Sequence, residues 1–133
     1  MALQYSTTLR NAQLDAIETV VGVSAILKIR SGAAPANVAT ADSGTVLATF
    51  NLPADWMAAA NAGSKAKSGT WEESSADATG TAAHFRLYAS DGTTCHMQGT
   101  VGTSGADMII DNTSINAGQV VTITGFTISA GNS

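Results

Sequence analysis

The sequence predicts a mainly β protein, an antiparallel β-sandwich or jelly roll of about seven short strands preceded by one N-terminal helix. Apolar residues recur at every second position in several short segments, and Gly, Asp and Asn turns separate these segments. A pattern with a period of three to four residues is confined to the start of the chain. We therefore divide the chain into a helical arm, residues 1–22, and a single β domain, residues 23–133.

The first predicted element is a helix over residues 9–21. Ser6, Thr7 and Thr8 offer oxygens that can cap its N-terminus, and Gly22 suits the positive φ of the residue that follows a helix. We expect this arm either to reach a partner or to pack on its own β domain. The residues predicted to make the contact share the apolar spacing of the helix: Leu9, Leu14, Ile17 and Val21.

Three strands are predicted in the first half of the β domain, over residues 24–30, 45–52 and 65–71. Pro53 ends the second strand, because proline has no amide donor for a ladder. Asp55 is expected to cap a short helical turn over residues 56–60, which Gly63 ends. The segments 31–43 and 72–80 are expected to be flexible loops that, with the tail 130–133, reach neighbouring molecules.

A hairpin is predicted from residues 84–88 and 95–98, with the turn around Asp91 and Gly92. A two-residue loop would mix apolar and polar side chains on each face. A three-residue loop with Gly92 in the left-handed region pairs Leu87 with Cys95 and Phe85 with Met97, which keeps one face apolar, so we predict that register.

Two further strands are predicted at the end of the chain, over residues 107–111 and 118–129, with a bulge at Gly125. The segments 112–114 and 116–118 are predicted turns. The spaced glycines Gly99, Gly102 and Gly105 are interpreted as loop and bulge positions, because they match no phosphate-binding motif.

Catalytic chemistry is not expected. His84 and His96 are the only histidines, and we place both on the exposed polar face of the hairpin, without a nucleophile at a useful spacing. The carboxylates Glu72 and Glu73 are neighbours on the chain and point to opposite faces of a strand, so they cannot flank one bond. The sequence predicts no enzyme and no cofactor.

Metal binding is not expected either. Asp107 and Asp111 fall on one face of a predicted strand and are candidates for an ion at a contact between chains, although a solvated pair is the preferred interpretation. Cys95 is the only cysteine, which excludes a disulfide within the chain and a cysteine-based zinc site. We expect an inert, buried thiol in a protein of a reducing compartment.

Composition points to contacts with protein. Charged residues make up 12% of the 133 residues and the net charge is −4, so the chain lacks the basic footprint of a nucleic-acid or membrane-surface binder. No apolar run is long enough to span a bilayer, and the first residues do not resemble a secretory signal. Ala, Gly, Ser and Thr account for 67 residues. A surface of small, weakly polar side chains is cheap to desolvate, which favours a homo-oligomer or docking on a larger lattice.

Three segments carry a resemblance to a known class of protein. Residues 1–18, 27–36 and 111–119 resemble small virion proteins encoded by tailed bacteriophages and prophages, and the similarity extends over most of the chain. The resemblance implies a structural protein that is made in the cytoplasm of a bacterial host and mounted on a virion. It identifies no site residues.

Within this class the favoured expectation is a capsid decoration, or cement, protein that bridges subunits of the major capsid protein and stabilises the head. The alternatives are a collar, tail or fibre-like component, and a host-surface carbohydrate-binding module. A carbohydrate-binding module would expose Trp56, Trp71 or Tyr88 for stacking on a sugar.

Overall fold

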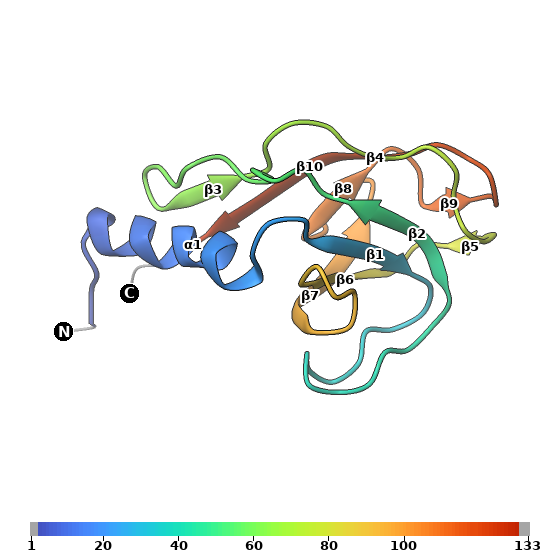
Figure 1. Ribbon diagram of the computed structural model, residues 1–133, viewed down its shortest axis with the longest axis horizontal. Coiled ribbons are helices and arrows are strands. Elements are labelled where there is room, and N and C mark those ends of the chain that lie inside the picture. Colours follow the sequence, from blue (N-terminus) through green and yellow to red (C-terminus); the bar gives the residue numbers. More distant parts are fainter. Residues whose placement is uncertain (1–2, 131–133) are drawn as a thin grey trace.

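The computed structural model describes residues 3–130. Within this range the chain forms one helix and ten strands (Figure 1). Their bounds are α1 Thr7–Val21, β1 Ile26–Arg30, β2 Val46–Asn51, β3 Ser64–Ala66, β4 Trp71–Glu73, β5 Gly80–Thr81, β6 His84–Tyr88, β7 Cys95–Gly102, β8 Met108–Ile110, β9 Ser114–Ile115 and β10 Val121–Ser129.

The main sheet is mixed and curled, with the strand order β2-β1-β6-β7-β8-β10-β3, and β4 also pairs with β10. The expected mainly β class and the N-terminal helix are confirmed, whereas a wholly antiparallel sheet is wrong, because β7 and β8 run parallel. The connection between them is only five residues long. Parallel neighbours are usually joined by a crossover of about a dozen residues or more, so a short connection in the sequence predicts an antiparallel pair. The Thr49 N–H donates to Glu73 Oε2 over 3.2 Å, which links β2 to β4 and draws the two ends of the sheet together.

Helix α1 begins and ends as its sequence predicts. The Ser6 side chain accepts a hydrogen bond from the Leu9 N–H, and Gly22 adopts a φ of +87°. The helix lies at one end of the molecule, and the segment before it runs away from the sheet (Figure 1).

The core lies inside the curl of the sheet. Leu27 and Ile29 of β1 and Phe85 and Leu87 of β6 have at most 1% of their surface exposed, as the alternation in β1 predicts. Aromatic rings complete this core: Trp71 lies 6.1 Å from Trp56 and 5.8 Å from Phe126, measured between ring centroids.

The predicted helical turn over residues 56–60 is wrong. Met57 forms a β-bridge with Lys67, and the Ala58 N–H donates to the Ala66 carbonyl. This extended backbone buries both Trp56 and Met57, and such tertiary packing outweighs the weak preference of a five-residue alanine-rich turn for helix.

The predicted strand over residues 65–71 is interrupted. It is split into β3 and β4 around Gly69, whose φ is +72°. The predicted polar loop 72–80 therefore supplies the end of β4 and the start of β5. Glu72 and Glu73 do point apart, since Glu72 accepts from Thr122 Oγ1 and Glu73 from the Thr49 N–H.

The predicted hairpin register is wrong by two residues. Leu87 pairs with Met97 and Phe85 with Gly99, and a bulge follows Leu87. The Asp91 side chain accepts hydrogen bonds from the Thr93 and Thr94 N–H groups, which widens the turn beyond three residues. A shift of two preserves the faces, so Leu87 and Met97 still point to one side.

Strand β7 is longer than predicted and includes Gly99 and Gly102. A Cβ atom at Gly99 would lie 2.8 Å from the Phe85 ring, so this glycine makes room for the ring within a strand rather than forming a loop. In contrast, Gly105 does lie in the turn before β8, and the predicted bulge at Gly125 of β10 is confirmed.

The loop 31–45 is irregular, as predicted, but it is held against the outer face of β1 and β6. Asp42 forms ion pairs with Arg30 (3.1 Å) and with Arg86, and Tyr88 Oη donates to Asp42 over 2.7 Å. His84 Nδ1 lies 2.7 Å from the Gly32 carbonyl oxygen. Part of the loop is therefore tethered to its own sheet, and its contact with a neighbouring molecule stays a prediction. Of the predicted flexible tail, residues 131–133 lie outside the described residues.

Candidate functional site

Helix α1 carries two apolar stripes. With 3.6 residues per turn, Leu14 and Val21 project on one side, and Leu9 and Val20 project roughly 120–140° away. The structure turns the first stripe inward: Leu14 is 3% and Val21 is 4% exposed. The second stripe faces outward, with Leu9 46% and Val20 66% exposed.

The four predicted contact residues are thus divided between these faces. Leu14 and Val21 pack on the chain's own β domain, Ile17 is half-buried against the core, and Leu9 is available to a partner. The sequence pattern does contain the outward residue Val20, but spacing along a helix does not reveal which stripe meets the sheet.

An apolar groove runs beside the outward stripe. It has a volume of about 260 Å³ and lies between the second half of α1 and the start of β7. Its lining combines Ala16, Ile17, Val20 and Val21 of the helix with His96 and Met97 of the strand. No charged side chain lines this groove, so a partner that enters it has no ion to desolvate.

Buried polar contacts fix the orientation of α1. The Lys65 ammonium, on a residue that is 1% exposed, lies 2.7 Å from both Asp15 Oδ1 and Glu18 Oε1. Burial acts to lower the pKa of Lys65, but its hydrogen bonds to Asp15 and Glu18 and their negative charges outweigh this effect and raise the pKa. The Lys65 hydrogen bond and the Ala60 N–H lower the pKa of Asp15.

Further hydrogen bonds connect the helix to the segment around β3. Glu18 accepts from the Met57 N–H, Asn11 accepts from the Gly63 N–H, and Arg10 donates to the Ala130 carbonyl. These contacts hold α1 by its polar side. The outward stripe is therefore presented at a fixed angle to the sheet.

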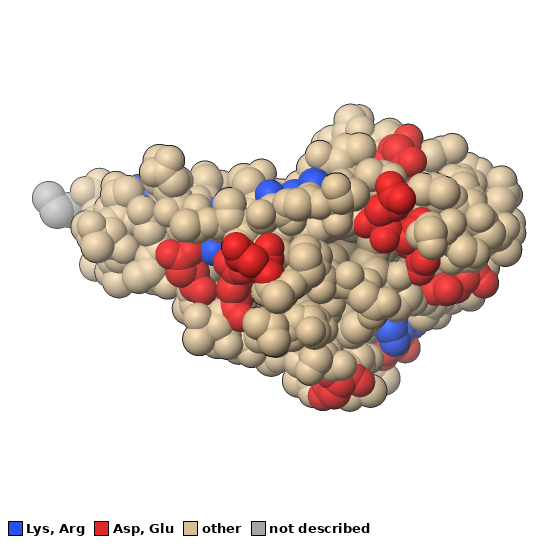
Figure 2. All heavy atoms as spheres, turned by 45° about the horizontal axis from the view of Figure 1, so that its top comes forward, with Lys and Arg blue, Asp and Glu red and all other residues tan. Residues whose placement is uncertain are grey.

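The surface carries few charges. On the face that Figure 2 shows, acidic side chains form separate groups and broad areas between them carry no charge. The exposed large apolar residues include Leu3, Leu9, Val20 and Val23, all on or beside the helix. This end of the molecule thus combines an exposed apolar stripe with charges that are paired on another side of α1, those of Asp15 and Glu18 with Lys65.

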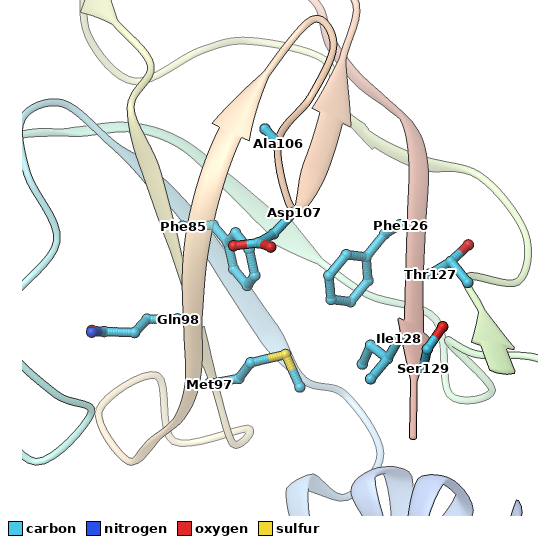
Figure 3. A pocket seen from close by; sticks show the side chains of 9 residues that line it. All are labelled: Phe85, Met97, Gln98, Ala106, Asp107, Phe126, Thr127, Ile128 and Ser129. Atoms are coloured by element: carbon cyan, nitrogen blue, oxygen red, sulfur yellow. The ribbon is translucent and has the colours of Figure 1, made fainter. Parts of the chain in front are cut away.

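A second hollow, of about 500 Å³, opens between β7 and β10 (Figure 3). Phe85, Met97, Phe126 and Ile128 point into it, and Asp107 lies at its β8 end. The Phe85 and Phe126 rings meet edge to face, with their centroids 5.5 Å apart. The sequence did not predict this hollow. It exists because β8 begins only at Met108, so that no strand lies between the remaining parts of β7 and β10.

The two histidines do not form a catalytic pair. His84 lies opposite Thr100 and is 1% exposed, so its predicted place on an exposed face is wrong. His96 borders the α1 groove, near the other end of β7. Loop 31–45 covers His84, and this cover is a long-range contact that strand alternation does not reveal.

The two aspartates that were candidates for binding an ion, Asp107 and Asp111, make separate hydrogen bonds. Asp107 accepts from the Thr100 N–H at 2.9 Å, whereas Asp111 accepts from the Thr122 N–H at 3.4 Å. Among residues 3–130 no three His, Cys, Asp or Glu side chains converge in a way that could hold a metal ion. Cys95 is half-buried rather than buried, and its thiol lies 3.4 Å from the Met97 carbonyl oxygen.

The aromatic residues expected in a sugar-binding groove are all inside the protein. Trp56, Trp71 and Tyr88 are each at most 1% exposed. Trp56 and Trp71 donate their indole N–H groups to the carbonyls of Gly22 and Ser68. None of the three offers a ring face to a carbohydrate.

Comparisons with protein-family models, with curated proteins and with solved structures give no match to this chain. Within the described part of the chain, no helix is long and apolar enough to cross a membrane.

Proposed function

We propose that this protein is a structural component of a bacteriophage virion, most simply a capsid decoration protein that binds and bridges neighbouring capsid subunits. The observation that carries the proposal is the outward stripe of α1, which holds Leu9 and Val20 exposed beside an apolar groove. The resemblance of residues 1–18, 27–36 and 111–119 to small virion proteins supplies the class of particle.

Exposure of this apolar stripe to water is unfavourable, and a partner that covers it would gain the free energy of burial. Burying a valine or leucine side chain stabilises a contact by roughly 1.5–3 kcal/mol. A single weak contact repeated over a lattice gives strong overall binding through avidity. A protein that binds only the assembled shell stabilises that shell by the free energy of binding.

Mechanically, α1 would serve as a rigid contact element. The Lys65 ion pairs with Asp15 and Glu18 join the helix to β3, so force on the helix passes into the sheet. A side chain of the partner subunit would enter the groove between Val20 and Met97. The remaining surface, with few charges, leaves room for contacts with further copies.

The test uses virions from a bacterial host that produces the protein. We expect copies in a fixed, high ratio to the major capsid protein, and we expect heads that lack the protein to lose DNA at a lower temperature. A few copies confined to the neck or tail would instead support the collar or tail alternative. Absence from purified particles would overturn the proposal.

A pair of matched variants locates the contact. Val20→Asp places a charge on the outward stripe, and Val120→Asp places the same charge on a valine that is also exposed (48%) but lies in the turn before β10. Val20→Asp should reduce head occupancy at least tenfold, because burial of an unpaired carboxylate opposes docking. Equal loss with both variants would argue against α1 as the contact.

A further inference from the structure

The hollow between β7 and β10 is a gap in the sheet. At one end β8 fills it, pairing with β7 through Val101 and Gly102 and with β10 through Ile123, Gly125 and Phe126. Beyond Met108, and among the described residues 3–130, residues 95–100 of β7 pair only with β6, and residues 127–129 of β10 pair only with β3. Two strand edges therefore face each other without a strand between them (Figure 3).

The backbone groups on both edges are oriented toward this gap. In β7 the Val101 N–H donates to Ala83, on the β6 side, and the Thr100 N–H donates to Asp107, on the gap side. Backbone direction alternates along a strand, so the N–H and C=O of Gln98 also face the gap.

In β10 the Phe126 carbonyl and the Ala130 N–H bond to Lys67 and Gly63, on the β3 side. By the same alternation, Ser129 directs its backbone groups into the gap, whereas Thr127 lies next to the Phe126–Met108 pair, where its N–H faces Asp107.

The gap also has the width of one strand and an apolar floor on which one face of a strand can pack. Because β8 already separates β7 from β10, the two strands are held about two strand spacings apart, roughly 9.6 Å, where the gap begins. The floor is apolar, formed by the Phe85 and Phe126 rings with Met97 and Ile128 beside them. A strand that alternates apolar and polar side chains fits such a site.

The chain itself contains a suitable strand. Its first six residues, Met-Ala-Leu-Gln-Tyr-Ser, place larger apolar or aromatic side chains at every second position. Leu3 is 70% exposed, and the described part of this segment, from residue 3, extends beyond α1 and away from its own sheet (Figure 1). The contacts of Arg10 and Asn11 with Ala130 and Gly63 hold the start of α1 in place, so the segment leaves the molecule in a set direction.

We infer that the N-terminal segment of a second copy, centred on Leu3, inserts as an additional strand between β7 and β10. The backbone groups of Gln98 and Ser129 pair with the inserted strand, and Leu3 packs on the apolar floor. Reciprocal insertion closes a two-fold dimer, which is the simplest symmetric assembly. This inference does not depend on a role in a virion, since it concerns contact between two copies.

The first experiment measures the oligomeric state by sedimentation over a range of concentrations. We expect a dimer, and we expect Leu3→Asp to weaken it about tenfold or more, since each arm loses the burial of one leucine. Leu3 is exposed in the single chain, so the variant should keep its circular dichroism spectrum and melting temperature. A wild-type monomer, or a dimer that Leu3→Asp leaves unchanged, would overturn the inference.

The second experiment identifies the occupant of the gap. In a Cys95→Ser background, Leu3→Cys with Ile128→Cys should yield a disulfide-linked dimer, whereas the control Val120→Cys with Ile128→Cys should not. A disulfide within one chain would mean that the segment folds back into its own gap, which contradicts exchange. Crosslinking by the control to the same extent would also contradict it, because the reaction would then reflect random collision.

Discussion

The tether of loop 31–45 allows a quantitative test through Asp42. This carboxylate faces two buried guanidinium groups, those of Arg30 and Arg86, and accepts a hydrogen bond from Tyr88. The substitution Asp42→Asn leaves two buried positive charges without a counter-ion. Removing one partner of a fully buried ion pair costs about 3–5 kcal/mol, and the 41% exposure of the Asp42 side chain reduces the expected loss to about 2–3 kcal/mol.

Two further variants calibrate this value. Tyr88→Phe removes two hydrogen bonds, the one that Tyr88 Oη donates to Asp42 and the one that it accepts from Arg30, but it leaves the Asp42 ion pairs in place, so we expect a loss of about 1–2 kcal/mol. Asp77→Asn changes an exposed carboxylate that bonds Thr49 Oγ1, and we expect less than about 0.5 kcal/mol. The free energy of unfolding is measured by urea titration, in which about 2 kcal/mol shifts the midpoint by roughly 1 M at a slope near 2 kcal/mol/M.

The pH dependence supplies an independent check. Burial acts to raise the pKa of Asp42, but the hydrogen bonds from Tyr88 and Arg86 and the charge of Arg30 outweigh it, so the folded-state pKa lies below 3.8. The stabilisation is therefore complete above pH 3.8 and disappears as the pH falls through the folded-state pKa. In Asp42→Asn, the free energy of unfolding should therefore fall less steeply as the pH drops below 3.8, which is the acid limb of the stability curve. A loss for Asp42→Asn no larger than that for Tyr88→Phe, with an unchanged acid limb, would refute the reasoning.

Three other predictions concern backbone strain, tyrosine ionisation and tryptophan burial. Gly44→Ala should lower the free energy of unfolding by about 3 kcal/mol or more, because the φ of this residue is +74° and the new Cβ would lie 1.9 Å from the Ser31 carbonyl oxygen. Gly92→Ala, at a φ of +72° but with open space around the new Cβ, should lower it by about 1 kcal/mol. Equal urea midpoints for the two variants would contradict this. Burial and the Asp42 hydrogen bond raise the pKa of Tyr88 from 10.0 to about 12, so the stabilisation by the neutral hydroxyl persists below pH 10 and is lost toward pH 12. Ultraviolet titration of the wild type against Tyr88→Phe measures this pKa. A difference between the two curves that is centred near pH 10 would contradict the raised pKa. Both tryptophans should resist acrylamide quenching, and ready quenching in the folded state would show that they are accessible.

Local patterns predicted the elements whose causes are local. The capped helix α1 follows from Ser6, Gly22 and the spacing between them, and β1 follows from the alternation of Ala25, Leu27 and Ile29. The apolar face of the β6–β7 hairpin was predicted although its register was not, because a shift of two residues moves no side chain to the other face.

The failed predictions depended on contacts between distant parts of the chain. His84 was placed on the exposed polar face of the hairpin, and it is buried because Gly32, 52 residues away, belongs to the loop that covers it. Residues 56–60 have helix-forming side chains, yet pairing with residues 66–68 holds them extended. No local signal identifies such partners in a single sequence.

The candidate contact site was predicted in part for the same reason. The apolar spacing of α1 was visible in the sequence, but contacts with distant residues, such as that of Lys65 with Asp15, determine that Leu14 faces inward and Val20 outward. Asp15 and Glu18, three positions apart on the helix, were not assigned a partner from the sequence, and in the structure both contact Lys65. Two lysines, Lys65 and Lys67, lie in the predicted strand over residues 65–71, and the sequence alone does not show that Lys65 is the partner.

The position of β10 in the chain has a consequence for biosynthesis. This last described strand pairs with β3, β4 and β8, so β3 and β4 lack their strand partner, and β8 has only β7 beside it, until residues 121–129 leave the ribosome. At about 5–20 residues per second, the nascent chain spends several seconds with open edges and an uncovered aromatic core. Chaperone binding during translation, and aggregation of chains truncated before residue 121, should therefore involve mainly the open edges of β3, β4 and β8.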